Sequence, residues 1–170
     1  ISLFSPAAVS SHREYVFDQQ KNAEKVSVHL VSKNEKTDGL GMPLPAGKVR
    51  LYQRDDDGGL EFVGEDMMDH TPESKEVRLT AGMAFDLTAK SEMTDQQRLS
   101  DRVWEESYKV SLHNSKKEAV EIKVVTRQYG DWKILESSLS YEKKDAFTIE
   151  FKVPVPAGKD TILTYRVRRQ

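Results

Sequence analysis

The chain has 170 residues, with 26 Lys and Arg, 28 Asp and Glu, and no Cys. That length suits one ordinary domain or two small ones, and the absence of Cys excludes disulfides, thiolate metal sites and a cysteine nucleophile. A formal net charge of -2 argues against an electrostatic nucleic-acid binder, which normally carries a basic excess. No run reaches the roughly 18 apolar residues that a membrane-spanning helix needs.

The opening residues carry no intact targeting signal. Residues 1–9 are mildly apolar, but they lack the basic region and the long apolar core of a signal peptide. Because residue 1 is Ile and not Met, we interpret the chain as a processed product or a piece of a longer protein.

Apolar residues alternate with polar ones along most of the chain, which is typical of strands with one buried and one wet face. The alternating apolar residues are, in chain order, Val26, Val28 and Leu30; Val49 and Leu51; Met83, Phe85, Leu87 and Ala89; Tyr108, Val110 and Leu112; Val120, Ile122 and Val124; Phe147, Ile149, Phe151, Val153 and Val155; and Leu163, Tyr165 and Val167. His29 and His113 alternate with the apolar residues of their own strands and are expected to face solvent. Strands at this spacing predict a sandwich or a barrel.

Turn-forming residues separate these strands. Residues 55–59 contain Asp-Gly at their centre and predict a hairpin between 49–54 and 60–64. Residues 39–47 cannot form a central strand, because their two prolines have no amide to donate to a sheet.

The polar segment 94–102 is the one stretch with helical character. Thr94 is placed to cap a helix, but no apolar stripe follows, so a loop or a strand extension fits equally well. We predict an irregular β-rich half over 1–92, a polar connector over 93–102 and an immunoglobulin-like half over 103–170. The expected fold class is therefore all-β, an antiparallel β-sandwich with the immunoglobulin-like half packed against the other half.

One group of residues has the chemistry of a metal site. Asp66, Asp69 and His70 lie close in sequence, and Glu65 adds a third acid. Carboxylate oxygens and a neutral imidazole suit a hard or borderline divalent cation. The alternative, which we favour, is a strand end that runs into the turn at 71–72 with its acids facing water. Nucleophile elbows and phosphate-binding glycine loops are absent from the sequence, so we predict no cofactor and favour a protein that is not an enzyme.

The two tryptophans are candidates for ligand binding. Trp104 or Trp132 would stack on a sugar ring if exposed, but in a small sandwich we favour a place in the core. Near the end of the chain, Arg166, Arg168 and Arg169 are interpreted as charges that protect an edge strand from pairing with other chains.

An ordered series of short motifs runs through the chain. The motifs are 39–52 (GLGMPLPAGKVRLY), 62–66 (FVGED), 69–72 (DHTP), 82–87 (GMAFDL), 106–108 (ESY), 112–114 (LHN), 131–138 (DWKILESS) and 151–158 (FKVPVPAG). Together they resemble the C-terminal region of the bacterial domain-of-unknown-function family 4139, the mucoidy-inhibitor-A-like proteins. The resemblance extends from about Arg13 to the end. The chain departs from the family pattern at 89–96 and 126–129, which weakens any shared role for those segments.

The resemblance implies an exported bacterial protein with an N-terminal β-rich region, a coiled-coil insertion and this β-rich C-terminal region. It supplies no catalytic residue, and it places the chain in the cell envelope or outside the cell as a segment of a longer protein. We therefore expect a non-catalytic module for cell-surface assembly, adhesion or protein–protein interaction.

The partners expected are a protein or a second copy, paired with an exposed strand edge such as 13–18 or the C-terminal strand, or a cell-surface glycan. Neither a nucleic acid nor a membrane span is expected. Two alternatives stay open: a metal-assisted hydrolase of glycan or peptide with Asp66, Asp69 and His70, and a carbohydrate-binding module with Trp104 or Trp132.

Overall fold

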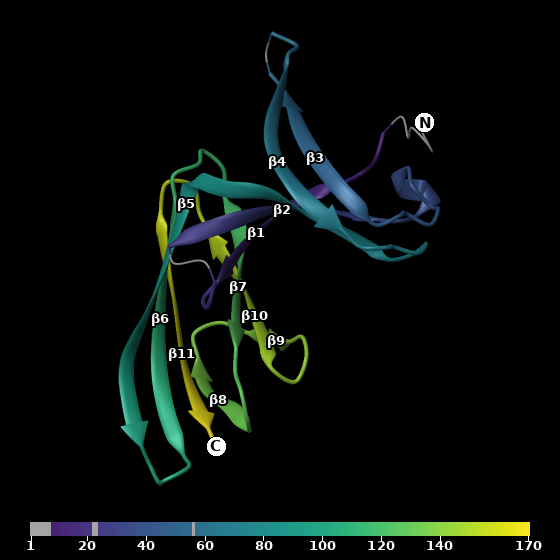
Figure 1. Ribbon diagram of the computed structural model, residues 1–170. Coiled ribbons are helices and arrows are strands. Elements are labelled where there is room, and N and C mark those ends of the chain that lie inside the picture. The colour runs from purple at the N-terminus through teal and green to yellow at the C-terminus, as the bar shows by residue number, and fades with distance from the viewer. Residues whose placement is uncertain (1–7, 22–23, 56) are drawn as a thin grey trace. The chain divides into compact units, whose positions relative to one another are not determined.

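The computed structural model describes residues 8–21, 24–55 and 57–170, so most of the opening segment and Asp56 of the predicted hairpin lie outside it (Figure 1). The described residues are almost entirely strands, which confirms the all-β prediction. The elements are β1 (His12–Asp18), β2 (Lys25–Lys33), the 3-10 helix η1 (Lys36–Asp38), β3 (Gly47–Arg54), β4 (Leu60–Met68), β5 (Glu76–Arg98), β6 (Trp104–Asn114), β7 (Val120–Arg127), β8 (Trp132–Ser137), β9 (Tyr141–Lys143), β10 (Thr148–Val155) and β11 (Asp160–Arg169). In this part of the chain no helix has the length and apolar character to cross a bilayer.

The strands form one large sheet and one small one. The large sheet has the order β8-β11-β6-β5-β2-β1-β7-β10-β9, and the small sheet pairs β3 with β4. The large sheet is mixed and not wholly antiparallel as predicted, because β1 runs parallel to β7, with Tyr15 opposite Ile122 and Asp18 opposite Val125.

The chain divides into two compact units, and neither is continuous in sequence. Unit 1 comprises the described residues up to Glu14 together with Ser27–Met83, and unit 2 comprises Tyr15–Val26 and Ala84–Gln170. This division differs from the predicted one, which placed a connector at 93–102. Residues 94–98 instead continue β5, because their backbone pairs with β6, with Arg98 opposite Trp104. Pairing with the backbone of β6 keeps this polar segment extended, although the segment has no apolar face to bury.

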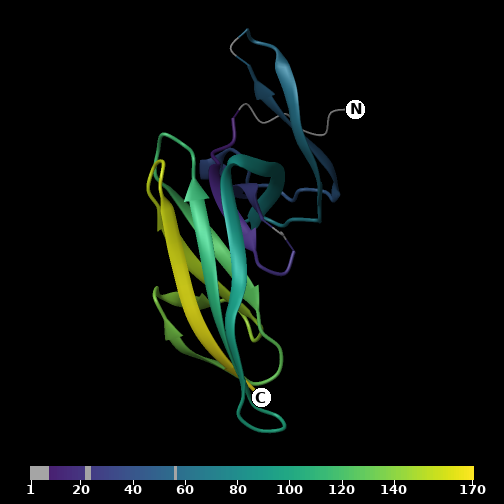
Figure 2. The same cartoon turned by 90° about the vertical axis from the view of Figure 1, so that its left-hand side faces the viewer.

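Unit 2 is a sandwich of two layers. One layer contains β5, β6, β11 and β8, and Figure 2 shows the first three running side by side; β7, β10 and β9 belong to the other. The rings of Phe151 on β10 and Tyr165 on β11 stack across the core at 5.2 Å. The core residues are Phe17, Val26, Leu87, Ala89, Val110, Leu112, Ile122, Val124, Ile134, Ile149, Phe151, Val153, Val155, Leu163, Tyr165 and Val167. Burial of this surface drives the fold of the unit.

Unit 1 relies more on polar contacts. Asn34, which is fully buried, follows β2 directly. Its side-chain amide donates hydrogen bonds to the carbonyls of Met42, Thr71 and Pro72, and its side-chain oxygen accepts from the amide of Gly41. One side chain thus fixes two irregular segments, including the proline-rich stretch that forms only an isolated bridge between Leu44 and Thr71, as the sequence predicted.

The buried faces of β2 and β5 differ in part from the prediction. In β2, Val28 and Leu30 are only half-buried, whereas Ser27 and Val31 are buried. The reason is that β2 leaves unit 2 after Val26 and enters unit 1, where the opposite face of the strand is covered. On β5, Phe85 was expected to be buried, yet its side chain is 99 % exposed.

The edges of the large sheet are β8 and β9, and not the strands proposed from the sequence. β1 lies between β2 and β7, and β11 lies between β8 and β6. The arginines of β11 therefore do not protect an edge. Arg166 and Arg168 instead pair with the carboxylate of Glu105 on β6, at 2.7 Å and 2.6 Å.

The predicted hairpin at 55–59 is confirmed. β3 ends at Arg54 and β4 begins at Leu60. Between them the amide of Asp55 donates to the carbonyl of Gly59, and the amide of Gly59 donates to the Asp55 carboxylate at 2.6 Å. Gly58 has a φ of 84°, a conformation that favours glycine.

Candidate functional site

The three residues predicted as metal ligands do not come together as a cation site. Among the described residues, no group of three or more His, Asp and Glu side chains is placed to hold a metal ion. The His70 imidazole accepts a hydrogen bond at Nδ1 from the amide of Ala46, and the carbonyl of Asp69 accepts one from the Thr71 hydroxyl. The geometry therefore adds no support to the metal prediction.

Asp66 has a different setting from the one expected. Its two carboxylate oxygens accept hydrogen bonds from the amides of Thr80, at 2.6 Å, and Met67, at 2.8 Å. Burial by itself raises the pKa of Asp66, but these donors outweigh it and hold the pKa below its ordinary value. A small contribution in the same direction comes from the charge on His29, whose Nε2 lies 3.0 Å from the hydroxyl of Ser27. Asp66 thus links β4 to the start of β5.

Trp132 serves the structure of unit 2. Its indole packs against the core, and its Nε1 donates a 2.9 Å hydrogen bond to the carbonyl of Ala146. The ammonium group of Lys143 lies 4.5 Å from the ring centroid, in the geometry of a cation–π contact. Since β8 and β9 are the two edges of the sheet, these contacts join one edge strand to the other and to the segment that follows it.

Trp104 lies in a different environment, in the wall of a hollow. The hollow has a volume of about 360 Å³ and is lined by Gln96, Trp104, Glu106, Tyr129 and Arg169. It lies where β5 ends, β6 begins and β11 ends. We name it the Trp104 hollow.

The polar groups of the Trp104 hollow are organised around one buried carboxylate. The Glu106 side chain is only 6 % exposed and pairs with the guanidinium of Arg169. It also accepts hydrogen bonds from the Gln96 amide at 3.1 Å and from the Tyr108 hydroxyl at 2.8 Å. Burial lowers the pKa of Arg169 and raises that of Tyr108. The carboxylate is therefore paired and held in one orientation.

Glu106 was not predicted from the sequence as a site residue, and Arg169 was interpreted only as a charge that protects an edge, although a signal for both was present. Along β6, Glu106 is in phase with the apolar Tyr108 and Val110, and along β11, Arg169 is in phase with Tyr165 and Val167. Each is a charged residue on the inward face of its strand. Such a residue is rarely buried unless it has a partner.

Tyr129 lines the Trp104 hollow from the turn between β7 and β8. Its side chain is 67 % exposed, and its ring stacks on that of Phe147 with centroids 6.3 Å apart. The turn that carries it is fixed to the end of β11, because the amide of Gln170 donates to the carbonyl of Asp131 at 2.7 Å and the reverse bond is 3.2 Å.

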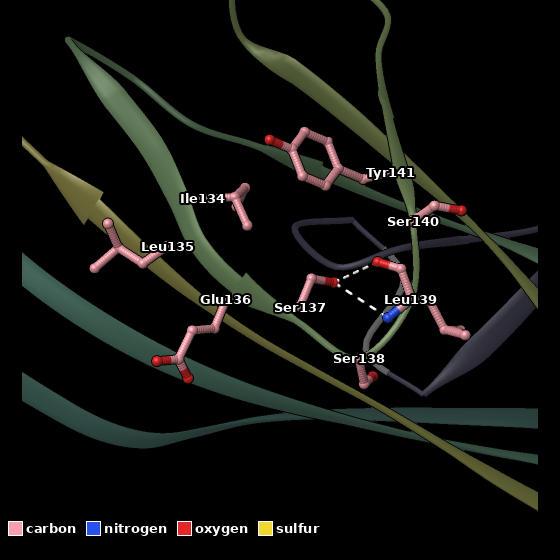
Figure 3. Close-up of a pocket in the computed structure, with 8 residues that line it drawn as sticks. All are labelled: Ile134, Leu135, Glu136, Ser137, Ser138, Leu139, Ser140 and Tyr141. Atoms are coloured by element: carbon pink, nitrogen blue, oxygen red, sulfur yellow. Dashed lines mark hydrogen bonds between the residues drawn. The ribbon is translucent and has the colours of Figure 1, made fainter.

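In a second hollow, formed by residues 134–141, the Ser137 side chain is already bound to the backbone of Leu139. Figure 3 shows the Ser137 hydroxyl between the two backbone groups of Leu139: it donates to the carbonyl at 2.6 Å and accepts from the amide at 3.4 Å. These bonds close the link between β8 and β9. They leave this hollow a weaker candidate than the one at Trp104.

The β3–β4 hairpin of unit 1 carries an exposed apolar surface that the sequence did not indicate. A bulge near Gly64 places Tyr52 opposite Phe62 and Arg54 opposite Leu60. Tyr52 and Phe62 meet edge to face at 5.7 Å, yet both are more than half exposed. We name this surface the hairpin face; its residues are Lys48, Arg50, Tyr52, Arg54, Leu60, Phe62, Glu65 and Met67.

The charges of the hairpin face are mostly positive. Glu65 pairs with Lys48 at 2.7 Å and with Arg50 at 3.1 Å, and hydrogen bonds from both hold the pKa of Glu65 below its ordinary value. Arg54 donates to the carbonyl of Gly58. The face therefore carries three cations and one carboxylate beside its apolar residues.

Comparison with protein-family models, with curated proteins and with solved structures found no match for this chain. The resemblance to family 4139 therefore stays a prediction, and the function of the chain has to be inferred from the Trp104 hollow and the hairpin face.

Proposed function

We propose that this chain is a non-catalytic binding module that takes up a strand from another protein along β3. The single observation that carries the proposal is the hairpin face, where Tyr52, Leu60, Phe62 and Met67 are each more than half exposed on one side of a two-stranded sheet. Large exposed apolar clusters with charged neighbours are typical of protein-interaction sites.

The free edge of β3 supports this mode of binding. β3 pairs only with β4 in the described sheets, so its other side has backbone groups available to an incoming strand. An added strand would gain main-chain hydrogen bonds, and its alternate side chains would lie beside Tyr52 and Arg54.

The charges on β3 favour a foreign strand over a second copy. If two β3 strands paired antiparallel about Leu51, Lys48 would lie opposite Arg54, and like charges opposite each other destabilise a sheet. A strand with acidic residues at those positions would gain complementary pairs instead. The partner we propose is therefore an extended segment in which acidic residues alternate with apolar or β-branched ones.

The proposal also assigns a cellular location and a family to the chain. We place the module in the cell envelope or outside the cell, as the C-terminal part of a longer exported bacterial protein related to family 4139. The support for this is the ordered series of motifs, among them 39–52, which precedes and includes most of β3.

A peptide titration tests the proposal. The probe is a ten-residue peptide in which Glu alternates with Val and Thr, titrated calorimetrically, and its control is the same peptide with Lys in place of Glu. We expect the acidic peptide to bind with a Kd of about 10–100 μM, more weakly as salt rises, because the attraction is screened. Equal binding of both peptides, or of neither, contradicts the proposal.

A matched pair of variants locates the binding surface. Phe62→Ser removes an aromatic ring from the hairpin face, whereas Phe85→Ser makes the same change at a ring outside it that is 99 % exposed. We expect Phe62→Ser to abolish peptide binding and Phe85→Ser to leave it unchanged. Circular dichroism confirms that both variants fold, and equal effects of the two changes would refute the assignment to the hairpin face.

A further inference from the structure

Beyond the proposed strand binding, we propose that the Trp104 hollow in unit 2 is a binding site for a neutral saccharide. The observation behind this is that an aromatic wall and a fixed polar floor occur in the same hollow. We call its two aromatic lining residues, Trp104 and Tyr129, the wall, and its three polar lining residues, Gln96, Glu106 and Arg169, the floor. Apolar walls with a few placed polar groups are the usual make-up of a small-molecule site.

The aromatic residues fit the shape of a sugar ring. A pyranose has C–H faces that pack on an aromatic ring, and its hydroxyls point outward around the rim. The guanidinium carbon of Arg98 lies 5.2 Å from the centroid of the Trp104 ring and so contacts one face of the indole. Trp104 nevertheless lines the hollow. Tyr129, which is two-thirds exposed, offers a second aromatic surface.

The polar floor fits the hydroxyls of the sugar. Carboxylate, amide and guanidinium groups together accept and donate hydrogen bonds to vicinal hydroxyls. Among the described residues, Oε1 of Glu106 accepts one hydrogen bond, from Gln96, and Arg169 has five N–H donors, so both residues keep hydrogen-bonding capacity for a ligand. The Glu106 carboxylate is already desolvated and oriented, so a ligand does not have to order it.

The charge of the hollow favours a neutral ligand. Glu106 is balanced by Arg169, and Arg98 is balanced by Asp101 at 2.8 Å. An anionic sugar would have to compete with these carboxylates for the same guanidinium groups. A neutral sugar is bound without breaking either pair.

Tyr129 is held in place for this role by its surroundings. The backbone bonds between Asp131 and Gln170 fix its turn, and Phe147 supports one face of its ring. The turn also needs Gly130, because its φ is 72° and an added Cβ would lie 2.7 Å from the Gln170 carbonyl oxygen. The wall of the site is thus formed before a ligand arrives.

Titration with three oligosaccharides tests the proposal. Cellotetraose and maltotetraose are the neutral probes, and tetragalacturonate is the acidic one, each followed by calorimetry and by tryptophan fluorescence of the whole chain. We expect one neutral probe to bind with a Kd of about 0.1–1 mM. Tyr129→Ala should weaken that binding about fivefold, as expected for the loss of one ring contact. Tyr52→Ala, an exposed tyrosine of unit 1, is the control and should bind as the unaltered chain does.

Because the chain has two tryptophans, a second pair of variants identifies which of them responds to the sugar in the fluorescence measurement. Quenching by the sugar should vanish in Trp104→Phe and persist in Trp132→Phe. No saturable response to either neutral probe, tighter binding of tetragalacturonate, or unchanged binding by Tyr129→Ala would overturn the proposal. The calorimetric comparison with Tyr129→Ala decides the matter even if Trp132→Phe does not fold. Peptide binding at the hairpin face is measured separately, so either proposal can fail without the other.

Discussion

Replacing Asn114 by Ala should destabilise unit 2 far more than the loss of an exposed polar side chain from the same strand. Asn114 ends β6 and is fully buried. Its amide donates to the carbonyls of Glu118 at 2.9 Å, Val155 at 3.1 Å and Pro156 at 3.2 Å, and its side-chain oxygen accepts from the amide of Lys116 at 2.9 Å. It thus ties the β6–β7 turn to the β10–β11 turn.

The expected magnitude follows from these four bonds. Each contributes about 0.5–1.5 kcal/mol net, and carbonyls left without a donor cost more where water cannot reach them. Only the bond to Val155 is wholly buried, so water will replace part of the loss at the others. We expect the free energy of unfolding to fall by about 2–4 kcal/mol, and Tm by roughly 5–15 °C for a chain of this length.

Urea unfolding and calorimetry at pH 7 measure this loss. The control is His113→Ala at the preceding residue, which removes an exposed pair with Asp160 at 2.7 Å and should cost under about 1 kcal/mol. The dependence of unfolding on urea should stay the same in both variants. A loss below about 1 kcal/mol for Asn114→Ala, or an equal loss for His113→Ala, would refute the view that buried amide bonds hold the two turns together.

Two further predictions concern charge and backbone. Hydrogen bonds from Arg168, and then from Arg166, keep the pKa of Glu105 below its ordinary value of 4.5, so these pairs stabilise the fold fully above that pH. The stabilisation is lost as pH falls through the lowered pKa. Glu105→Gln should therefore be less stable than the unaltered chain at pH 7, and the difference should shrink as the pH falls through that pKa; a constant difference in urea midpoints would contradict this. Gly130→Ala and Gly158→Ala both place Ala at a positive φ, but only the first meets a backbone atom, at 2.7 Å. Gly158→Ala should lose about 1 kcal/mol of unfolding free energy and Gly130→Ala clearly more. Equal losses in thermal unfolding would exclude a role for that contact.

Strands that lie wholly within one unit were predicted well from the sequence. In β10, the alternation identified Ile149, Phe151 and Val153, and all three are fully buried. Even Pro154 is consistent with this strand. β9 pairs only with residues 149–151, so beyond them β10 has a neighbour on the β7 side alone, and proline is tolerated on an open side.

Strands that pass between units were predicted less well. Alternation assigns one buried face to a whole strand, but β2 and β5 each change units partway along, so Val28 and Phe85 fall on the wrong side. The sequence also did not show which strands are neighbours in the sheet. Whether β11 is an edge depends on where β8 returns to the sheet, and no local pattern encodes that.

The candidate site was predicted only in part. Trp104 was identified by its chemistry, and it does line a hollow, whereas Trp132 belongs to the structure. Glu106 and Arg169 lie far apart in sequence, and only the pairing of β6 with β11 brings them together. The hairpin face was missed because a bulge decides which side of β4 Phe62 occupies.

The parallel pairing of β1 with β7 has a consequence for synthesis of the chain. β1 leaves the ribosome about a hundred residues before its partner, since Tyr15 lies opposite Ile122. At about 5–20 residues per second, this strand waits roughly 5–20 s for its place in the sandwich. Unit 1 is encoded mostly within that interval, so its folding precedes the closure of unit 2. The apolar segment around Phe17, which is buried in the finished unit, therefore stays without its β7 partner throughout that interval.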